Sequence, residues 1–395
     1  MSAALPKVAL REAAEPVSRP VAPSPGETYR QLGVSLWGKG AYEREPVDGG
    51  LTKYQQLFRA EQGDIVVNKI WARNGSVGVV DDALAGCHGS GEFPMFAPIQ
   101  GRLDPRWMHW VTKTKDFWAQ CDQKSQGTSG QNRIKPERFL EVEIPLPPLN
   151  EQQRIVARIE ELAAKVEEAR GLRNASTDEA EAFTRSATDG AYKRLVATVG
   201  LSRLQDACTS ITDGDHLTPA FSEAGVKFIF VGNVSTGRLH FDRVKFVTPD
   251  YFKALSATRV PRRGDVLYSA VGATLGVPAV VECDEDFCFQ RHVAILKPDR
   301  ERASPRFLWH MLRSRTVFDK AWASTTGSAQ PTIPLRAIRE LPLPLPQLDE
   351  QHRIVAELDA LQAKVNAVKA LQTETAAELD AMLPAILDKA FKGEL

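Results

Sequence analysis

Two closely similar stretches decide the fold: PLPPLNEQQRIVARIEELAAKV at residues 145–166 and PLPQLDEQHRIVAELDALQAKV at residues 344–365. They align without a gap at an offset of 199 residues, and 14 of the 22 positions are identical. Internal similarity at a fixed offset marks a repeated structural unit. The chain of 395 residues therefore contains one unit of about 200 residues twice.

The residues after each Pro-Leu-Pro segment have the periodicity of a helix. Proline disfavours helix in the residue before it, so we expect Asn150 and Asp349 to be the N-caps. The first helix should reach about Leu195, with breaks near Gly171 and Gly190. Apolar residues recur at steps of three and four, as in a coiled-coil seam. They are Ile155, Ile159, Leu162 and Val166 in the first copy, and Ile354, Leu358, Leu361 and Val365 in the second.

Helices of this length need a partner for their apolar seam. At ~1.5 Å per residue, a helix of roughly 40 to 45 residues is about 60 to 68 Å long. We therefore expect the two helices to pair antiparallel, as a spacer that relates the two copies by a pseudo-two-fold axis. The alternative is that each helix packs only on its own domain.

The part of each copy before its helix predicts a mixed domain. It is rich in Gly and Pro and contains short β-branched or aromatic runs, such as DIVVNKIW at residues 64–71 and HVAILKP at residues 292–298. Such runs read as strands. We predict an α+β fold of two tandem mixed α/β domains separated by long helices. The expected bounds are 1–140 and 200–342 for the domains, and 141–199 and 343–395 for the helical spacers.

Charge is distributed unevenly although Lys+Arg and Asp+Glu both number 50. Residues 30–140 carry a net charge of +3 and residues 200–342 carry +4, whereas the two helical segments carry −3 and −4. This pattern favours a phosphate-facing surface on the domains and a protein-facing surface on the helices. The alternative is an ordinary solvated surface.

Two stretches approach the patterns of a nucleotide site and a zinc site, but neither fits its pattern. GVSLWGKG at residues 33–40 approaches a phosphate-binding loop, but Gly40 stands where Ser or Thr must bind Mg²⁺. Cys283, Cys288 and His292 lack the spacing of a zinc site. The sequence therefore predicts a recognition protein with no catalytic or metal-binding residues of its own.

Both copies place long cations beside an aromatic residue after a pair of glycines. In the first copy these are Lys39, Tyr42 and Arg44. Arginine and lysine beside an aromatic side chain suit contacts with phosphates and base edges. The alternative is a hairpin with solvated charges. The corresponding residues of the second copy are Arg238, Phe241 and Arg243.

The repeated Pro-Leu-Pro, Glu-Gln and Arg-Ile-Val element strongly resembles the specificity subunit of type I restriction-modification systems. The strand Gly264-Asp265-Val266-Leu267, the segment FQRHVAILKP and the turns SGQNRI and SAQPTI are also similar to that family. The resemblance covers nearly the full chain. It implies that each domain is a target recognition domain, and that the two domains read the two halves of a split site in double-stranded DNA.

The resemblance also implies the partners. Two modification (methyltransferase) subunits would dock on the helices, bind S-adenosylmethionine and methylate adenine, so the chain itself needs no cofactor. It leaves open whether restriction subunits, which use ATP and Mg²⁺ to translocate and cut DNA, join the complex. Candidate DNA-binding residues are Lys39, Tyr42, Arg44, Lys69, Arg73, Gln131, Arg238, Phe241, Arg243, Arg291 and Gln330.

Two other classes of function remain as alternatives. One is a tandem-domain coiled-coil scaffold that binds only proteins, and the other is a self-contained nuclease or NTPase. We expect a cytoplasmic protein with no membrane segment, because no apolar run approaches the ~18 to 20 residues that cross a bilayer.

Overall fold

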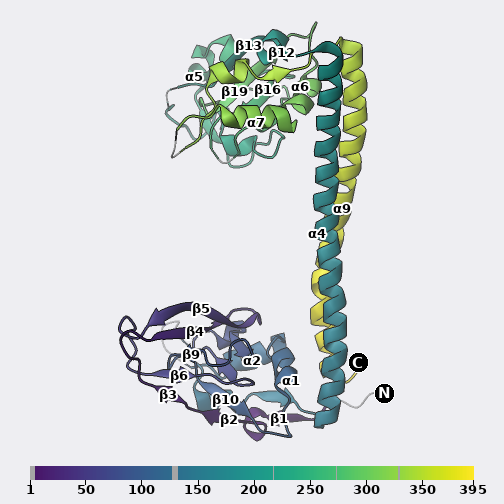
Figure 1. Cartoon of the computed structure of the whole chain (residues 1–395). Helices are drawn as coiled ribbons and strands as arrows, with labels where there is room; N and C mark the ends of the chain where they lie inside the picture. Colours follow the sequence, from purple (N-terminus) through teal and green to yellow (C-terminus); the bar gives the residue numbers. More distant parts are fainter. Residues whose placement is uncertain (1–4, 127–131, 217, 273, 328–329) are drawn as a thin grey trace. The chain divides into compact units, whose positions relative to one another are not determined.

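The computed structural model describes residues 5–126, 132–216, 218–272, 274–327 and 330–395 (Figure 1). The chain divides into two units. Unit 1 contains Met1–Leu172 and Glu374–Leu395, and unit 2 contains Arg173–Thr373. Each unit holds one mixed domain and a segment of both long helices, α4 (Leu149–Val199) and α9 (Leu348–Phe391).

The domain of unit 1, which we call domain 1, is built on two sheets. A four-stranded antiparallel sheet has the order β2-β10-β7-β8, and a five-stranded sheet has the order β3-β6-β9-β4-β5. A separate pair, β1 with β11, closes the domain beside the start of α4. The strands are β1 (Lys7–Ala9), β2 (Ala14–Val17), β3 (Pro20–Val21), β4 (Thr28–Ser35), β5 (Gly40–Asp48), β6 (Leu57–Arg59), β7 (Ile65–Val67), β8 (Val77–Val79), β9 (His88–Gly89), β10 (Met95–Pro98) and β11 (Glu143–Pro145). The helices are α1 (Pro105–Val111), α2 (Lys115–Gln123) and α3 (Pro136–Phe139).

The domain of unit 2, domain 2, repeats the first sheet and replaces the second. Its four-stranded antiparallel sheet has the order β13-β19-β16-β17, and a three-stranded sheet has the order β15-β14-β18. The pair β12 with β20 corresponds to β1 with β11. The strands are β12 (Ser202–Arg203), β13 (Cys208–Asp213), β14 (Val226–Ile229), β15 (Lys245–Val247), β16 (Val266–Ser269), β17 (Pro278–Val280), β18 (Phe287–Phe289), β19 (Val293–Pro298) and β20 (Pro342–Leu343). The helices are α5 (Pro249–Ala254), α6 (Pro305–Leu312), α7 (Arg315–Ala323) and α8 (Leu335–Arg339).

Equivalent backbone contacts show where each copy of the repeat begins. The amide of Leu10 donates to the carbonyl of Val142 at 2.8 Å, and the amide of Leu204 donates to the carbonyl of Leu341 at 2.9 Å. In both domains a short 3₁₀ turn follows, and then the first strand of the four-stranded sheet. The opening strands of the two copies are therefore equivalent.

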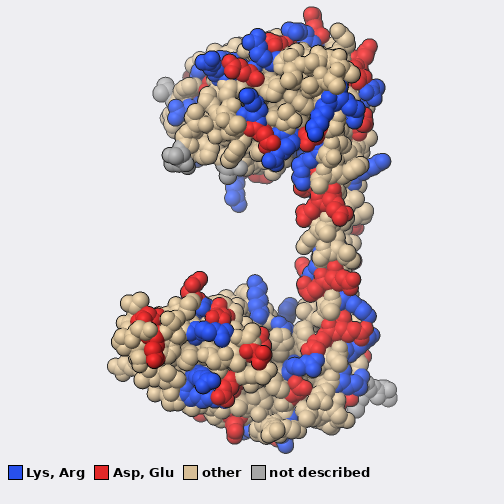
Figure 2. All heavy atoms as spheres, in the orientation of Figure 1, with Lys and Arg blue, Asp and Glu red and all other residues tan. Residues whose placement is uncertain are grey.

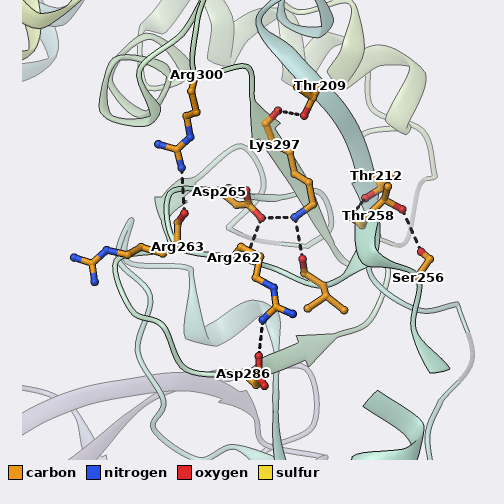
Figure 3. Close-up of polar contacts among 11 residues, drawn as sticks. Thr209, Thr212, Ser256, Thr258, Arg262, Arg263, Asp265, Asp286, Lys297 and Arg300 are labelled. Atoms are coloured by element: carbon orange, nitrogen blue, oxygen red, sulfur yellow. Dashed lines mark hydrogen bonds and ion pairs between the residues drawn. The ribbon is translucent and has the colours of Figure 1, made fainter. Parts of the chain in front are cut away.

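A Gly-Asp turn before the central strand of each domain holds a buried carboxylate. In domain 2, Gly264 has a φ of 86°, and Asp265 accepts hydrogen bonds from the amide of Arg262 at 2.8 Å and from Nζ of Lys297 at 2.6 Å (Figure 3). A buried charge is tolerated when it is paired and hydrogen-bonded. In domain 1 the buried carboxylate is that of Asp64, which pairs with Arg19 at 2.6 Å.

The long helices lie antiparallel within each unit. In unit 1, Ile155 and Ile159, near the start of α4, share a core with Leu387 and Ala390, near the end of α9. In unit 2 the end of α4 meets the start of α9. The residues of that contact are Ala191, Tyr192 and Leu195 of α4, and Ile354 and Leu358 of α9.

The same apolar residues also pack into the domains, so the alternative packing is present as well. Ile155 and Ile159 belong to the core of domain 1 with Trp107 and Phe96, and Ile354 belongs to the core of domain 2. Six of the eight predicted seam residues are buried, and Leu162 and Leu361 are half-buried.

The helix ends differ from the sequence prediction. The helix α4 is continuous from Leu149 to Val199, so no break occurs at Gly171 or Gly190. The predicted N-caps are wrong, because Asn150 and Asp349 lie inside the first turn of their helices. The first helical hydrogen bonds already go to the carbonyls of the residues before α4 and α9: Gln152 to Pro148 at 3.0 Å, and Gln351 to Gln347 at 3.1 Å.

One buried glutamine fastens each helix to its domain. The side chain of Gln152 accepts from the amide of Asp104 at 2.9 Å and donates to the carbonyls of Arg102 and Pro147, both at 2.8 Å. Gln351 is its equivalent, and both glutamines are fully buried. Its partners are the amide of Ser304 at 2.9 Å and the carbonyls of Arg302 at 2.7 Å and Pro346 at 2.8 Å.

Candidate nucleic-acid interface

The hairpin of β4 and β5 displays two predicted DNA-binding side chains of domain 1. Tyr42 and Arg44 lie two residues apart on β5, and both are exposed. Their side chains cross over Gly33 on β4, because a Cβ at position 33 would lie 2.7 Å from the Tyr42 ring and 2.9 Å from Cδ of Arg44. Glycine at this position leaves room for the aromatic ring and the aliphatic part of the arginine side chain against the strand.

The tip of this hairpin brings two more predicted cations together. The amide of Trp37 donates to the carbonyl of Asn74 at 2.7 Å, and the amide of Gly38 donates to the carbonyl of Gly75 at 3.1 Å. These bonds place the exposed Lys39 beside the turn that carries Arg73. Lys39 and Arg73 therefore lie on neighbouring turns, although 34 residues separate them in sequence.

A third predicted cation, Lys69, lies after β7 and is partly neutralised. Its ammonium is 3.5 Å from Glu92, which also lies 3.4 Å from Arg133. The amide of Ile134 donates to the carbonyl of Lys69 at 2.9 Å. The predicted residue Gln131 lies outside the described residues.

In domain 2, Arg291 and Gln330 line one hollow of about 370 Å³. Its other lining residues include Asp213 and His292. Arg291 is positioned by its amide, which donates to the carbonyl of Asp215 at 3.0 Å. The structure thus brings together two predicted residues that lie 39 positions apart.

The segment Asp213-Gly-Asp-His216 beside this hollow was missed as a site by sequence reasoning. Ring nitrogen Nε2 of His216 lies 3.0 Å from Asp213, and the hydroxyl of Tyr251 donates to Asp215 at 2.6 Å. Burial of the hydroxyl, reinforced by this bond, raises the pKa of Tyr251. A Cβ on Gly214 would lie 2.1 Å from the carbonyl oxygen of Phe289. The Asp-Gly-Asp-His pattern was the available signal.

The remaining predicted residues of domain 2 do not repeat the hairpin of domain 1. The segment around Phe241 contains no strand, and Phe241 is half-buried against Phe287, with ring centroids 5.5 Å apart. Arg243 is exposed and has a φ of 55°. Arg238 lies in a different hollow from Arg291. Equal sequence spacing in the two copies therefore does not give equal geometry.

The side chains that these surfaces carry suit binding. Within the described ranges, no three His, Cys, Asp or Glu side chains gather as metal ligands. The predicted residues carry long cationic, amide and aromatic side chains, which is the chemistry of phosphate and base contacts. In the same part of the chain, no helix is long and apolar enough to cross a membrane.

Comparison with known families decides the identity of the repeat. The model of the type I restriction modification DNA specificity domain matches residues 35–175 and 203–377. The chain belongs to this family. Each match covers most of one mixed domain and the first part of the helix that follows it, as far as residue 175 in α4 and residue 377 in α9.

Two curated relatives agree with this assignment. The chain is 27% identical over 171 residues to the type I restriction enzyme EcoBI specificity subunit of Escherichia coli, which is 43% of this chain and 36% of that protein. It is 23% identical over 279 residues to the MjaVIII specificity subunit of Methanocaldococcus jannaschii, which is 66% of this chain and 64% of that protein. The chain thus matches between about a third and two thirds of the length of these relatives.

Solved structures share the fold of this specificity-domain chain. A chain from a structural study of complex assembly and conformational transition in a type I R-M system has a TM-score of 0.77 and 24% identity, and the match covers 99% of this chain and 98% of that one. The HsdS subunit of Thermoanaerobacter tengcongensis has a TM-score of 0.61 and 24% identity, with 99% and 97% covered. The predicted α+β fold with tandem domains and long helices is confirmed.

Proposed function

We propose that this chain is the DNA specificity subunit of a type I restriction-modification complex, in which each domain reads one half of a bipartite target. The observation that carries the proposal is the family match to both copies of the repeat. The two domains share a framework but carry different exposed side chains. Two different readers on one chain suit an asymmetric split site.

The reading residues in this proposal come from the surfaces described above. In domain 1, Lys39, Arg44 and Arg73 contact phosphates or guanine edges, and Tyr42 packs against a base or sugar. In domain 2, Arg291 and Gln330 reach base edges, since arginine pairs with guanine and glutamine with adenine through two hydrogen bonds each. Positioning by phosphates and reading of bases are thereby divided among different side chains.

Catalysis in this proposal belongs to partner subunits. Two modification subunits dock on the acidic helices, related by an approximate two-fold axis, and bind S-adenosylmethionine. The net charges of −3 and −4 on the helical segments support a protein-facing role. Restriction subunits that use ATP and Mg²⁺ would join from outside the specificity chain.

The test is to express the chain with its modification subunits and map methylated adenines across the genome by single-molecule sequencing. We expect one asymmetric motif made of two short elements separated by unread base pairs. A single continuous motif, or no methylation, would contradict the proposal. A protein-binding scaffold predicts no methylation that depends on this chain.

A seven-residue insertion in both helices tests the spacer role. We place it after Leu172 in α4 and after Thr373 in α9, so that the antiparallel segments of each unit keep their partners. Seven helical residues add about 10.5 Å, which is close to the rise of about three base pairs. We expect the same two elements with about three more unread base pairs between them. Unchanged spacing would contradict the spacer role.

A further inference from the structure

A large cationic hollow lies in unit 2 where domain 2 meets α9. It has a volume of about 800 Å³, and its wall includes the turn at residues 236–241, the helix α6 and one face of α9. Four cations line it, and Glu282 is the one acidic residue among its lining residues in the described part of the chain. The cations are Arg238, Arg306, Arg313 and Lys369.

Trp309 orients two of these cations. The guanidinium carbon of Arg306 lies 4.0 Å from the centroid of the indole, and that of Arg313 lies 4.1 Å from it. Trp309 is buried, and its Nε1 donates to the carbonyl of Gly237 at 3.1 Å, which fixes the ring. Stacking on a fixed ring restricts both guanidiniums before any ligand arrives.

Arg306 and Lys369 are the neutralised members of the set. Nε of Arg306 donates to both oxygens of Asp359, at 2.9 Å and 3.1 Å. Lys369 pairs with Glu181. The positive charge available to a ligand therefore comes from the other two cations.

Arg313 and Arg238 have no carboxylate partner among the described residues. The one side-chain hydrogen bond of Arg313 to these residues runs to Gln362 at 3.3 Å. Burial, and then the charges of Arg306 and Arg185, lower the pKa of Arg313, against the raising effect of Glu181. Crowded cations repel one another, and a bound anion would relieve that repulsion.

The cationic surface continues beyond this hollow. Two adjoining hollows, of about 360 Å³ and 790 Å³, share Arg313 with it. Figure 2 shows Lys and Arg gathered, with some acidic residues, where domain 2 adjoins the helices. Together the two hollows add Arg185, Lys193 and Arg315 to the set, along with the acidic residues Glu181 and Asp189.

The equivalent cation of unit 1 makes a different contact. Lys113 stands where Arg313 stands after the Pro-Arg-aromatic helix, and its Nζ donates to the carbonyl of Gly38 at 3.0 Å. In unit 2 the equivalent carbonyl, that of Gly237, accepts from Trp309, and Arg313 donates to the side chain of Gln362 instead. A cation that donates to no backbone carbonyl of the glycine turn is thus a feature of the second copy of the repeat.

We propose that the hollow lined by Arg238 and Arg313 binds phosphodiester groups of the DNA backbone next to the bases that domain 2 reads. This inference rests on the proposed function. A guanidinium fork matches two phosphate oxygens. Three of the four cations belong to the domain and one to the acidic helices, which favours nucleic acid over a protein partner of the helices.

The test measures the affinity of the assembled complex for a duplex with its methylated target, over a series of salt concentrations. Loss of one phosphate contact flattens the slope of log affinity against log salt by about 1. We expect this for Arg313→Gln and for Arg238→Gln, so each variant should lose about 3.5-fold less affinity between 50 and 200 mM salt. Arg313→Lys keeps the charge and should keep the slope. The methylated motif should not change.

Arg263→Gln is the matched control. Arg263 is an exposed cation of domain 2, pairs with Asp284 at 2.9 Å and lines none of the three hollows. It should leave the slope unchanged. Unaltered slopes for both Arg313→Gln and Arg238→Gln overturn the phosphate site. So does weaker assembly with the modification subunits at an unaltered DNA slope, which would assign the hollow to an acidic protein segment. If the wild-type complex fails to bind DNA, the proposed function itself fails.

Discussion

Domain 1 and domain 2 share one framework and differ in what they display on it. Both have the same order in the four-stranded sheet, a buried Gly-Asp turn and a glutamine that fastens the following helix. Beyond that framework, domain 1 has a five-stranded sheet with a long hairpin, whereas domain 2 has a three-stranded sheet. The contrast teaches that the two copies keep the same attachment of each domain to the helices. They differ in their display surfaces, by which we mean the surfaces that carry the predicted DNA-binding residues, such as Arg44 in domain 1 and Arg291 in domain 2.

The contacts along α1 and α6 differ in the same manner. Arg106 pairs with Glu160 in domain 1, and Arg306 pairs with Asp359 in domain 2. Four positions further, domain 1 has Trp110 and domain 2 has His310. The ion pair to the helix is therefore shared, while the side chain next to it is not.

The largest effect should follow from breaking the shared framework. Gln351→Ala would leave one buried amide and two buried carbonyls without their partner. Each unsatisfied group costs about 1 to 3 kcal/mol, so we expect unit 2 to lose at least about 3 kcal/mol of unfolding free energy. Gln152→Ala should do the same to unit 1. Hydrogen exchange in denaturant, followed by mass spectrometry, measures each unit separately.

The neighbouring residues His352 and Gln153 are the controls for this comparison. Both are exposed, and their replacement by Ala should change neither unit by more than about 0.5 kcal/mol. If Gln351→Ala weakened both units equally, the units would not be independent in their attachment.

Lowering the pH should destabilise unit 2 through its buried histidine, His310. His310 is buried and contacts Asp359 at 2.7 Å; burial lowers its pKa to about 4, against the raising effect of Asp359. Below pH 6.5 the unfolded chain takes up a proton that the folded chain does not bind until about pH 4. Unit 2 should therefore lose up to roughly 3 kcal/mol of stability as the pH falls through this window.

His310→Asn should remove this acid-dependent loss from unit 2 and leave that of unit 1. The pKa of His109 in unit 1 is likewise lowered to about 4, again chiefly by burial, so unit 1 supplies an internal reference. Unfolding at pH 7 and pH 5 measures both. An equal acid response in variant and wild type would contradict the assignment to His310.

The smallest effects should follow from substitutions of the predicted DNA-binding residues. Each substitution should change the methylated motif in one of its two elements. Arg291→Ala or Gln330→Ala should relax one position of one element, with a loss of about 1 to 3 kcal/mol of discrimination. Arg44→Ala should alter only the other element. Methylome sequencing of cells that express each variant provides the measurement. A change in both elements from one substitution would contradict separate reading.

The position of the long helices was predictable because short segments with a strong apolar periodicity, residues 145–166 and 344–365, determine it. The repeated Pro-Leu-Pro and Arg-Ile-Val element located the starts of both helices to within one turn. The N-caps were misplaced by two residues, because the carbonyls of Pro148 and Gln347 already accept the first helical bonds and these two residues therefore hold the cap positions.

The display surfaces were less predictable because they depend on contacts between distant loops. Lys39 meets the turn of Arg73 through bonds of Trp37 and Gly38, and no sequence spacing encodes that contact. The alignment of Tyr42 with Phe241 failed for the same reason, since one is exposed on a strand and the other packs on Phe287. The proximity of Arg291 and Gln330 likewise needs the loops themselves.

The last turns of α9 determine when domain 1 can complete its folding during synthesis. Phe391 packs edge-on against Trp107, with ring centroids 5.0 Å apart, and Leu387 and Ala390 complete the core of domain 1. A nascent chain that has left the ribosome as far as residue 172 still lacks this part of its first core. The core of domain 1 is therefore complete only after residues 387–391 are translated, and a nonsense codon before them would destabilise a domain that lies far earlier in the sequence.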